Sequence, residues 1–315
     1  MRILVVGAGA MGGYFGGRLL EAGRDVTFLV RPRRAAQLAK TGLIIRSKFG
    51  DASLPAPPTV AAEALHEPFD LILLSCKAYD LKSAADSFAP AVGKNTAILP
   101  FLNGMAHIDY LVERFGSAAV LGGQCVISTT LDSEGRILHL NDMHLLSFGV
   151  RDGSTSERAQ AIAKELSGVK FEARLSKAIL HEMWEKWVFI ATAASINCLM
   201  RAMVGDIMAA GGKDLTLALL AECDGIAKAY GFASTEANIK RAVSILTTPG
   251  SPFAASMLRD VEHGAPIEAD HVVGDLIARG QTKNCNTPLL QIAYTHLKAY
   301  EARRAREAAT TAKAA

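Results

Sequence analysis

The chain is poor in cysteine, in net charge and in long apolar runs. Its five cysteines are an odd number, widely scattered and without a C-x-x-C pair, so they favour buried free thiols in a cytoplasmic protein over a disulfide framework. A formal net charge of +3 is too small to indicate a nucleic acid or a membrane surface as partner. The opening apolar run is too short for a secretory signal, and the longest uncharged stretch, residues 187–200, is too short for a membrane span. No metal site is predicted.

The first 23 residues carry the strongest motif. A short β-branched run at 2–6 is typical of a buried strand, and a helical stretch follows from residue 13 to a glycine at 23. Between them lies a G-x-G-x-x-G turn made of Gly7, Ala8, Gly9, Ala10, Met11 and Gly12. In such a turn the first glycine bends the chain, the second admits a pyrophosphate, and the third lets the helix approach the strand. The helix N-terminus favours phosphate. We therefore predict a dinucleotide site.

The end of the second expected strand, residues 25–30, indicates which dinucleotide binds. An NAD-binding unit commonly has Asp or Glu here to hold the ribose 2′-hydroxyl, whereas this chain has Arg31, followed by Arg33 and Arg34. Guanidinium groups pair with a 2′-phosphate that a carboxylate would repel. The alternative is that these arginines begin a solvated helix. We predict that NADPH is preferred over NADH.

Two later strand candidates, residues 69–75 and 96–101, deliver Lys77 and Asn103 at their carboxyl ends. Ligands of open α/β sheets lie beyond these ends, so both residues are expected over the cofactor. Asn103-Gly104 is equally typical of a plain turn. Other expected features are a strand at 43–47, a proline-rich irregular or edge segment at 55–58, a last short strand at 169–172, and an antiparallel extension of the sheet at 122–129, 136–140 and 145–148.

Half of the 315 residues are hydrophobic, which is enough for two cores, and the length favours two domains. Strand signals end near Arg174. We predict an α/β Rossmann-type NADP-binding domain at 1–174 and an all-α substrate domain at 175–315, with the active site in the cleft between them. The expected helices are 176–203, 214–230, 236–246, 254–263, 266–279 and 288–306.

Two ionisable residues of the helical half are candidates for chemistry. Lys186 lies between tryptophans at the start of an apolar helix, where desolvation would lower its pKa and suit it to proton transfer. The alternative is a snorkelling lysine paired with Glu182. Glu268 is expected in the first turn of a helix opened by Pro266, where an acidic residue also simply favours the helix dipole.

These residues resemble the ketopantoate reductases (2-dehydropantoate 2-reductases) over nearly the whole chain. The matching marks, in order, are GAGAMG at 7–12, Arg31, Lys77-Ala78, Asn103-Gly104-Met105, and residues 182–186, 256–260 and 268–270. The resemblance implies a C-terminal domain like that of 6-phosphogluconate dehydrogenase. It also implies reduction of ketopantoate to pantoate by NADPH, the reaction of EC 1.1.1.169, in the biosynthesis of pantothenate and coenzyme A.

The resemblance also implies roles for single residues. Lys186 would be the general acid, and Glu268 would bind a substrate hydroxyl and lie against the cofactor. Asn103 would hold Lys186 or the nicotinamide ribose and contribute to both substrate and cofactor binding. Ser256 would bind the substrate carboxylate region, and Lys77 the cofactor ribose. A cytoplasmic location and a small 2-oxo acid as partner are expected, and a homodimer stays an open alternative.

The sequence departs from the family at three positions. Ile190, Ala194 and Phe253 stand where characterised members tend to carry asparagines, while Ser195 and Asn197 point elsewhere on the helix. Loss of such amides removes hydrogen bonds to a polar acid. Two alternatives therefore remain: a reductase of a more apolar 2-oxo acid or β-ketoacid, and a non-catalytic protein that senses NADP(H).

Overall fold

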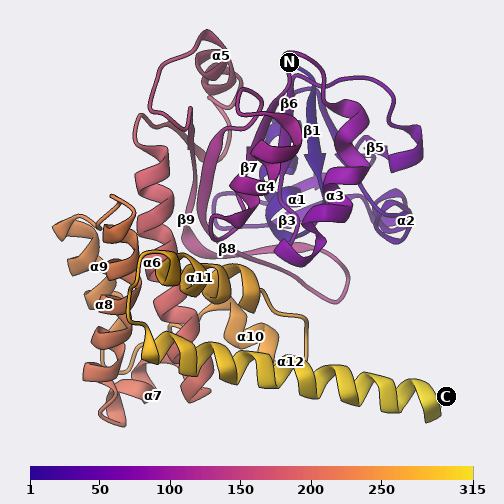
Figure 1. Cartoon of the computed structure of the whole chain (residues 1–315). Helices are drawn as coiled ribbons and strands as arrows, with labels where there is room; N and C mark the ends of the chain where they lie inside the picture. The colour runs from indigo at the N-terminus through magenta and orange to yellow at the C-terminus, as the bar shows by residue number, and fades with distance from the viewer. Residues whose placement is uncertain (315) are drawn as a thin grey trace. The chain divides into compact units, whose positions relative to one another are not determined.

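The computed structural model describes residues 1–314 (Figure 1). The chain forms two compact units. The first contains Met1–Leu102 and His107–Leu180, and the second contains Asn103–Ala106 and the chain from His181 onward. The four residues 103–106 thus belong to the second unit although they lie within the sequence of the first. The domain boundary at residue 174 stays a prediction.

A five-stranded parallel sheet forms the centre of the first unit. Its strand order is β5-β2-β1-β6-β7, and every pair in it is parallel. The apolar runs predicted as buried strands form β1 (Ile3–Val6), β6 (Leu71–Leu74) and β7 (Ala97–Pro100), and every residue of these three strands is buried. The remaining strands and the helices of this part are β2 (Val26–Leu29), β5 (Thr59–Val60), α1 (Ala10–Glu21), α2 (Pro32–Thr41), α3 (Leu81–Phe88) and α4 (Ala106–Phe115). The predicted α/β Rossmann-type fold is confirmed.

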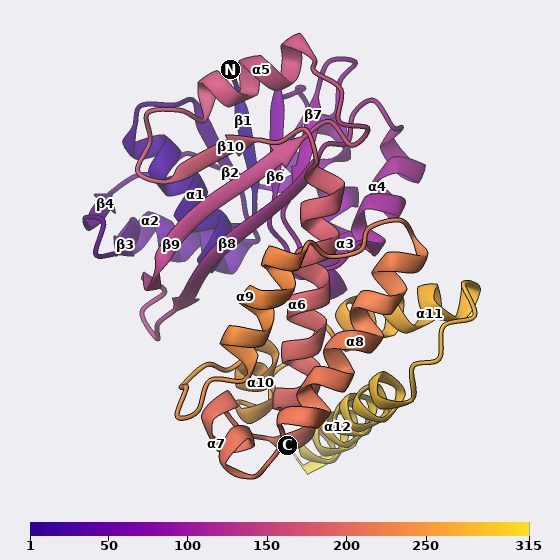
Figure 2. The ribbon, with the colours of Figure 1, turned by 90° about the vertical axis from the view of Figure 1, so that its left-hand side faces the viewer.

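A second sheet replaces the predicted antiparallel extension of the first. It contains β3 (Leu43–Arg46), β4 (Ala52–Leu54), β8 (Gly122–Leu131), β9 (Ile137–Gly149) and β10 (Glu172–Leu175); α5 (Glu157–Glu165) precedes β10. Figure 2 shows β8 and β9 as long neighbouring strands. β9 runs unbroken where two short strands were expected. Within it, Asn141 Oδ1 accepts a hydrogen bond from Ser128 N at 2.9 Å, at the bulge between Ile127 and Thr129.

The second unit is helical, as predicted, and no strand occurs in it within the described residues from 181 to 314. Its helices are α6 (Ile179–Met200), α7 (Val204–Ala209), α8 (Lys213–Ala229), α9 (Glu236–Leu246), α10 (Ser256–Glu262), α11 (Asp275–Thr282) and α12 (Pro288–Ala314), with a π-helical turn at Asp270–Gly274. Helix α6 begins three residues after the predicted Ser176. Helix α6 ends three residues before the predicted Met203, where Arg201 adopts a left-handed backbone with φ of 54°. The short helix α7 was not predicted.

Buried aromatic and aliphatic side chains fix the helices of the second unit. Trp187 of α6 is fully buried, and its indole N–H donates to the carbonyl of Val272 at 2.8 Å. Helix α8 packs against α11 and α12. None of the helices in the described part of the chain is both long enough and apolar enough to cross a membrane.

None of the five cysteines, all of which lie in the described part of the chain, forms a disulfide. Burial raises the pKa of Cys198 and of Cys223 to about 12. Both thiols are therefore protonated at neutral pH and poor nucleophiles, since the thiolate is the reactive form.

Candidate functional site

The glycine turn after β1 has the geometry that a pyrophosphate requires. Gly7 has a φ of +91°, and a Cβ at Gly12 would overlap the Ser75 hydroxyl and the Gly7 carbonyl. A Cβ at Gly9, in contrast, would meet nothing within 4 Å. Gly9 is the N-cap of α1 and offers no side-chain cap. The first N–H groups of α1 are thus left for an anion, and the open face at Gly9 admits its approach. The residues present fit a dinucleotide phosphate.

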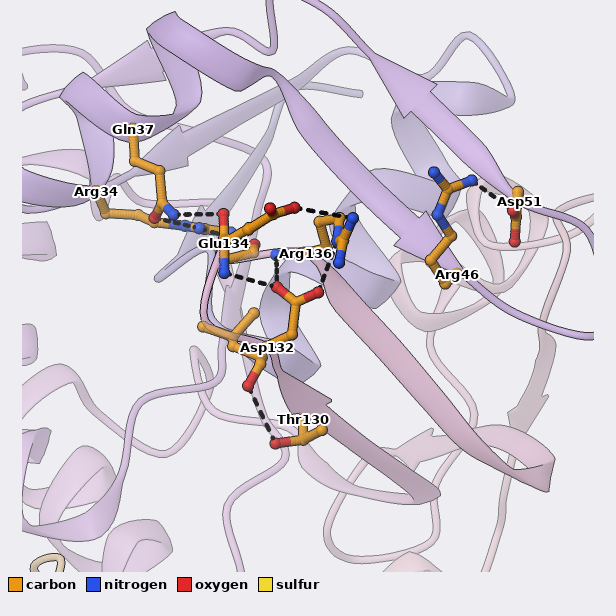
Figure 3. A network of polar contacts seen from close by, with 10 residues as sticks. Arg34, Gln37, Arg46, Asp51, Thr130, Asp132, Glu134 and Arg136 are labelled. Atoms are coloured by element: carbon orange, nitrogen blue, oxygen red, sulfur yellow. Dashed lines mark hydrogen bonds and ion pairs between the residues drawn. The ribbon is translucent and has the colours of Figure 1, made fainter.

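Arg34 connects this turn to the tip of the β8–β9 hairpin. Figure 3 shows Arg34 and Gln37 beside Glu134 of that tip. Its Nε donates to the carbonyl of Ala8 at 2.9 Å, and its Nη1 donates to Gln37 Oε1 at 2.7 Å and to the carbonyl of Gly135 at 3.1 Å. Gln37 donates in turn to the carbonyl of Glu134 at 2.7 Å. Burial lowers the pKa of Arg34. The Arg34 guanidinium therefore binds the backbone carbonyls of Ala8 and Gly135. Its role is thus structural and differs from that expected of Arg31.

Arg31 occupies the N-cap position of α2 and is largely exposed. Its Nη2 donates to Asp80 Oδ1 at 2.7 Å, and this hydrogen bond raises the pKa of Arg31. Asp80 follows β6, three residues after Lys77, whose carbonyl accepts a hydrogen bond from Asp80 N at 2.9 Å. Sequence reasoning missed Asp80. The signal that identifies it is the position of β6 beside β1 in the strand order, which places the residues after β6 at the turn.

In the second unit, the segment of Asn103 lies against His271. Gly104 has a φ of +79°, and a Cβ there would lie 2.8 Å from the His271 carbonyl oxygen and 3.0 Å from its ring Cδ2. Burial lowers the pKa of His271, and the negative charge of Glu268 and a hydrogen bond to the Asn103 backbone oppose that effect. The structure therefore brings Asn103 and Glu268 to one histidine. His271 carries no motif of its own and was not identified from the sequence.

The local structure at Glu268 differs from the expectation. Residues 265–268 are not helical, and the helix begins at Ala269. The cause is that Ala265 is held by its neighbours: its N–H donates to the Asp260 carbonyl at 2.8 Å and its carbonyl accepts from Tyr300 Oη at 2.8 Å. The carbonyl of Glu268 accepts from Val272 N at 2.9 Å. Glu268 thus lies at the helix start, half-buried, and not within a first turn opened by Pro266.

Lys186 is half-buried on α6, next to the fully buried Trp187. The neighbouring Glu185 accepts hydrogen bonds from Thr235 N and Thr235 Oγ1, each at 2.8 Å. The role of Lys186 stays a prediction.

Ser256 is exposed at the first position of α10. Asn197 of α6 holds the residue before it, since Asn197 Oδ1 accepts from Ala255 N at 3.0 Å and its Nδ2 donates to the Ala202 carbonyl at 2.8 Å. Phe253 packs on Phe189 with ring centroids 5.8 Å apart. The side chain of Asn197 thus binds backbone groups, and an apolar ring stands at position 253.

A parallel sheet with a glycine turn after its first strand, joined to a helical unit, defines a dinucleotide-dependent oxidoreductase of the two-domain type. The chain belongs to the ketopantoate reductase family. The family model described as "Ketopantoate reductase PanE/ApbA" matches residues 3–153, and the model of its C-terminal part matches residues 178–301. Members of this family use NAD(P)H.

Individual relatives have different names. An uncharacterized oxidoreductase, YkpB, of Bacillus subtilis is 38% identical over 303 residues, which cover 96% of this chain and 99% of the relative. The crystal structure of 2-dehydropantoate 2-reductase from Methylococcus capsulatus is 26% identical, with a TM-score of 0.85 and coverage of 96% and 98%. A D-mandelate dehydrogenase bound to NADH and anilino(oxo)acetate shares the fold at 20% identity, with a TM-score of 0.85 and coverage of 96% and 99%.

Proposed function

We propose that this protein is a cytoplasmic, NADPH-dependent reductase that converts ketopantoate to pantoate for the synthesis of pantothenate and coenzyme A. The observation that carries the proposal is the match to the family across both units, together with the residues at its marks: the glycine turn and Arg31 in one unit, and Lys186, Glu268 and Asn103 in the other. Its partners are the cofactor and a small 2-oxo acid. A homodimer is compatible with the proposal.

The chemistry assigns one task to each group. When bound, the reduced nicotinamide supplies a hydride to the carbonyl carbon. The Lys186 ammonium would then donate a proton to the carbonyl oxygen and stabilise the negative charge that develops there. Glu268 would accept a hydrogen bond from a substrate hydroxyl, and Asn103 would hold Lys186 or the nicotinamide ribose. Ser256 would hold the substrate carboxylate, and Lys77 the cofactor ribose.

A second candidate function has its own observation. Ile190, Ala194 and Phe253 are apolar where the family commonly offers amides, and Phe253 packs on Phe189 near the buried residues Val204 and Leu246. A pocket lined in this way would lose hydrogen bonds to a polar acid and favour a more apolar 2-oxo acid or β-ketoacid. The third alternative, a sensor that binds NADP(H) without chemistry, differs from both because it has no turnover.

A panel of substrates separates these candidates. NADPH oxidation is followed by nicotinamide absorbance with ketopantoate and with 2-oxo acids of increasing apolar size. For a ketopantoate reductase we expect kcat/KM of about 10⁴ M⁻¹s⁻¹ or more on ketopantoate, above every other member of the panel. Higher activity on an apolar 2-oxo acid would change the assigned substrate but leave the assigned reaction type unchanged. Tight NADPH binding with no turnover at all would favour the sensor.

Replacement of Lys186 tests the catalytic assignment. We expect Lys186→Ala to lower kcat by about two orders of magnitude or more, the share that general acid–base catalysis usually supplies, and to leave NADPH affinity unchanged. Lys228→Ala is the matched control, because Lys228 is an exposed lysine near the end of another helix of the same unit. Equal turnover in the two variants would remove Lys186 from the mechanism.

A further inference from the structure

The ion pair between Arg31 and Asp80 lies at the glycine turn. Strands β2 and β6 flank β1 on its two sides. Arg31 comes two residues after β2 and Asp80 six residues after β6, while the glycine turn directly follows β1. The contact of 2.7 Å between Arg31 Nη2 and Asp80 Oδ1 therefore joins the two loops on either side of this turn. In a Rossmann unit this is where the adenosine ribose lies.

The Asp80 carboxylate is directed to Arg31 and not to the backbone of its own helix. Asp80 directly precedes α3, and its side chain makes no capping hydrogen bond to the first turn. The side chains of Arg31 and Asp80 are 69% and 34% exposed, so a ligand can reach both groups of the pair.

The two possible riboses make opposite demands on this pair. A 2′-phosphate needs the Arg31 guanidinium, which Asp80 already occupies, and it would lie beside a carboxylate of the same charge sign. A free 2′-hydroxyl can donate a hydrogen bond to the carboxylate while the ion pair stays intact. The acidic residue that is absent from the end of β2 is thus supplied by the loop after β6.

We propose that Asp80 is a determinant of cofactor specificity. Its carboxylate lowers the preference for NADPH that Arg31 alone would give, and it accepts a hydrogen bond from the ribose 2′-hydroxyl of NADH. The site therefore binds both cofactors. This inference rests on the proposed function, since it places the adenosine ribose of a nicotinamide cofactor at Arg31.

Direct binding measures the effect without any substrate. NADPH and NADH are titrated by their fluorescence into the full-length protein and its Asp80→Asn variant. Asparagine keeps the size of the side chain and its aptitude for the N-cap position while it removes the charge. We expect the ratio of NADPH to NADH affinity to rise about two- to fivefold, in the range of exposed charge interactions. Asp80→Ser, also a good N-cap residue, should change the ratio in the same direction.

Asp86→Asn is the matched control. Asp86 lies on the same helix and forms an ion pair with Arg114 at 2.6 Å, but it does not contact Arg31. We expect this variant to leave the ratio unchanged. Arg31→Ala should weaken NADPH far more than NADH, because only NADPH carries the 2′-phosphate.

Each outcome points to one conclusion. If the unchanged protein binds neither cofactor, the proposed function fails. If it binds NADPH, but Asp80→Asn and Asp80→Ser leave the ratio of NADPH to NADH affinity where Asp86→Asn leaves it, the role of Asp80 is refuted and the proposed function stands. A fall of the ratio in the Asp80 variants would also refute it.

Discussion

At the scale of single residues, Gly104 shows how backbone conformation fixes a site segment. Its φ of +79° lies in the left-handed region, and the space where a side chain would begin is taken by the carbonyl and ring of His271. An alanine there would carry both backbone strain and a steric conflict. The position of the adjacent Asn103 thus depends on the absence of a side chain at 104.

We expect Gly104→Ala to lower the free energy of unfolding by about 2 kcal/mol or more, the sum of left-handed strain and overpacking. Denaturant unfolding measures the change. Gly231→Ala is the control, because Gly231 has a φ of +83° in the same unit but nothing within 4 Å of its would-be Cβ. A loss no larger than that of the control would show that contact with His271 contributes nothing.

At the scale of elements, a cluster of rings joins α1 to β9 within the first unit. Tyr14 Oη and His144 Nδ1 are 2.8 Å apart, and Phe49 stacks on His144 with ring centroids 4.0 Å apart. Burial lowers the pKa of His144, as do the charges of His139 and Arg18, while Glu172 opposes them. The folded state therefore favours the neutral form of this imidazole.

This shift predicts a loss of stability in acid. Because the pKa of His144 is lower in the folded than in the unfolded chain, the unfolded chain binds more protons, and stability falls as the pH drops below about 6.5, the ordinary histidine pKa. We expect His144→Gln to lose less stability than the unchanged protein between pH 7.5 and pH 5.5. Denaturant midpoints measured across this range provide the comparison, and the exposed His66→Gln should follow the unchanged protein. Parallel pH curves for all three proteins would contradict the assignment.

At the scale of the whole molecule, the parts predicted correctly are those whose signals are local in the sequence. The parallel sheet follows from short apolar runs, and the glycine turn follows from the spacing of its glycines. Gly7 has the positive φ that such a turn requires, and Gly12 packs too closely on its neighbours for a side chain. The helical second unit follows from long stretches without strand signals. Each of these signals is read within about twenty residues.

The parts that were missed depend on pairing between distant residues. The second sheet joins β3 to β9 across most of the first unit, and no local pattern specifies that pairing. The sequence around Asp80 predicts only the start of a helix, whereas its side chain pairs with the distant Arg31. The sequence around His271 predicts only a helix, whereas this residue lies against the distant Gly104. Tertiary contact, and not local propensity, decides such positions.

Residues Asn103–Ala106 belong to the second unit, so they can reach their final contacts only after the second unit has been synthesised. During synthesis these four residues leave the ribosome long before His271, their later neighbour. At about 5–20 residues per second, the interval is on the order of ten to thirty seconds. The first unit can form its sheets during this interval, but the segment that carries Asn103 has to wait for the last part of the chain. A polypeptide ended at Leu180 would therefore keep the sheets and leave this segment without the neighbour that fixes it.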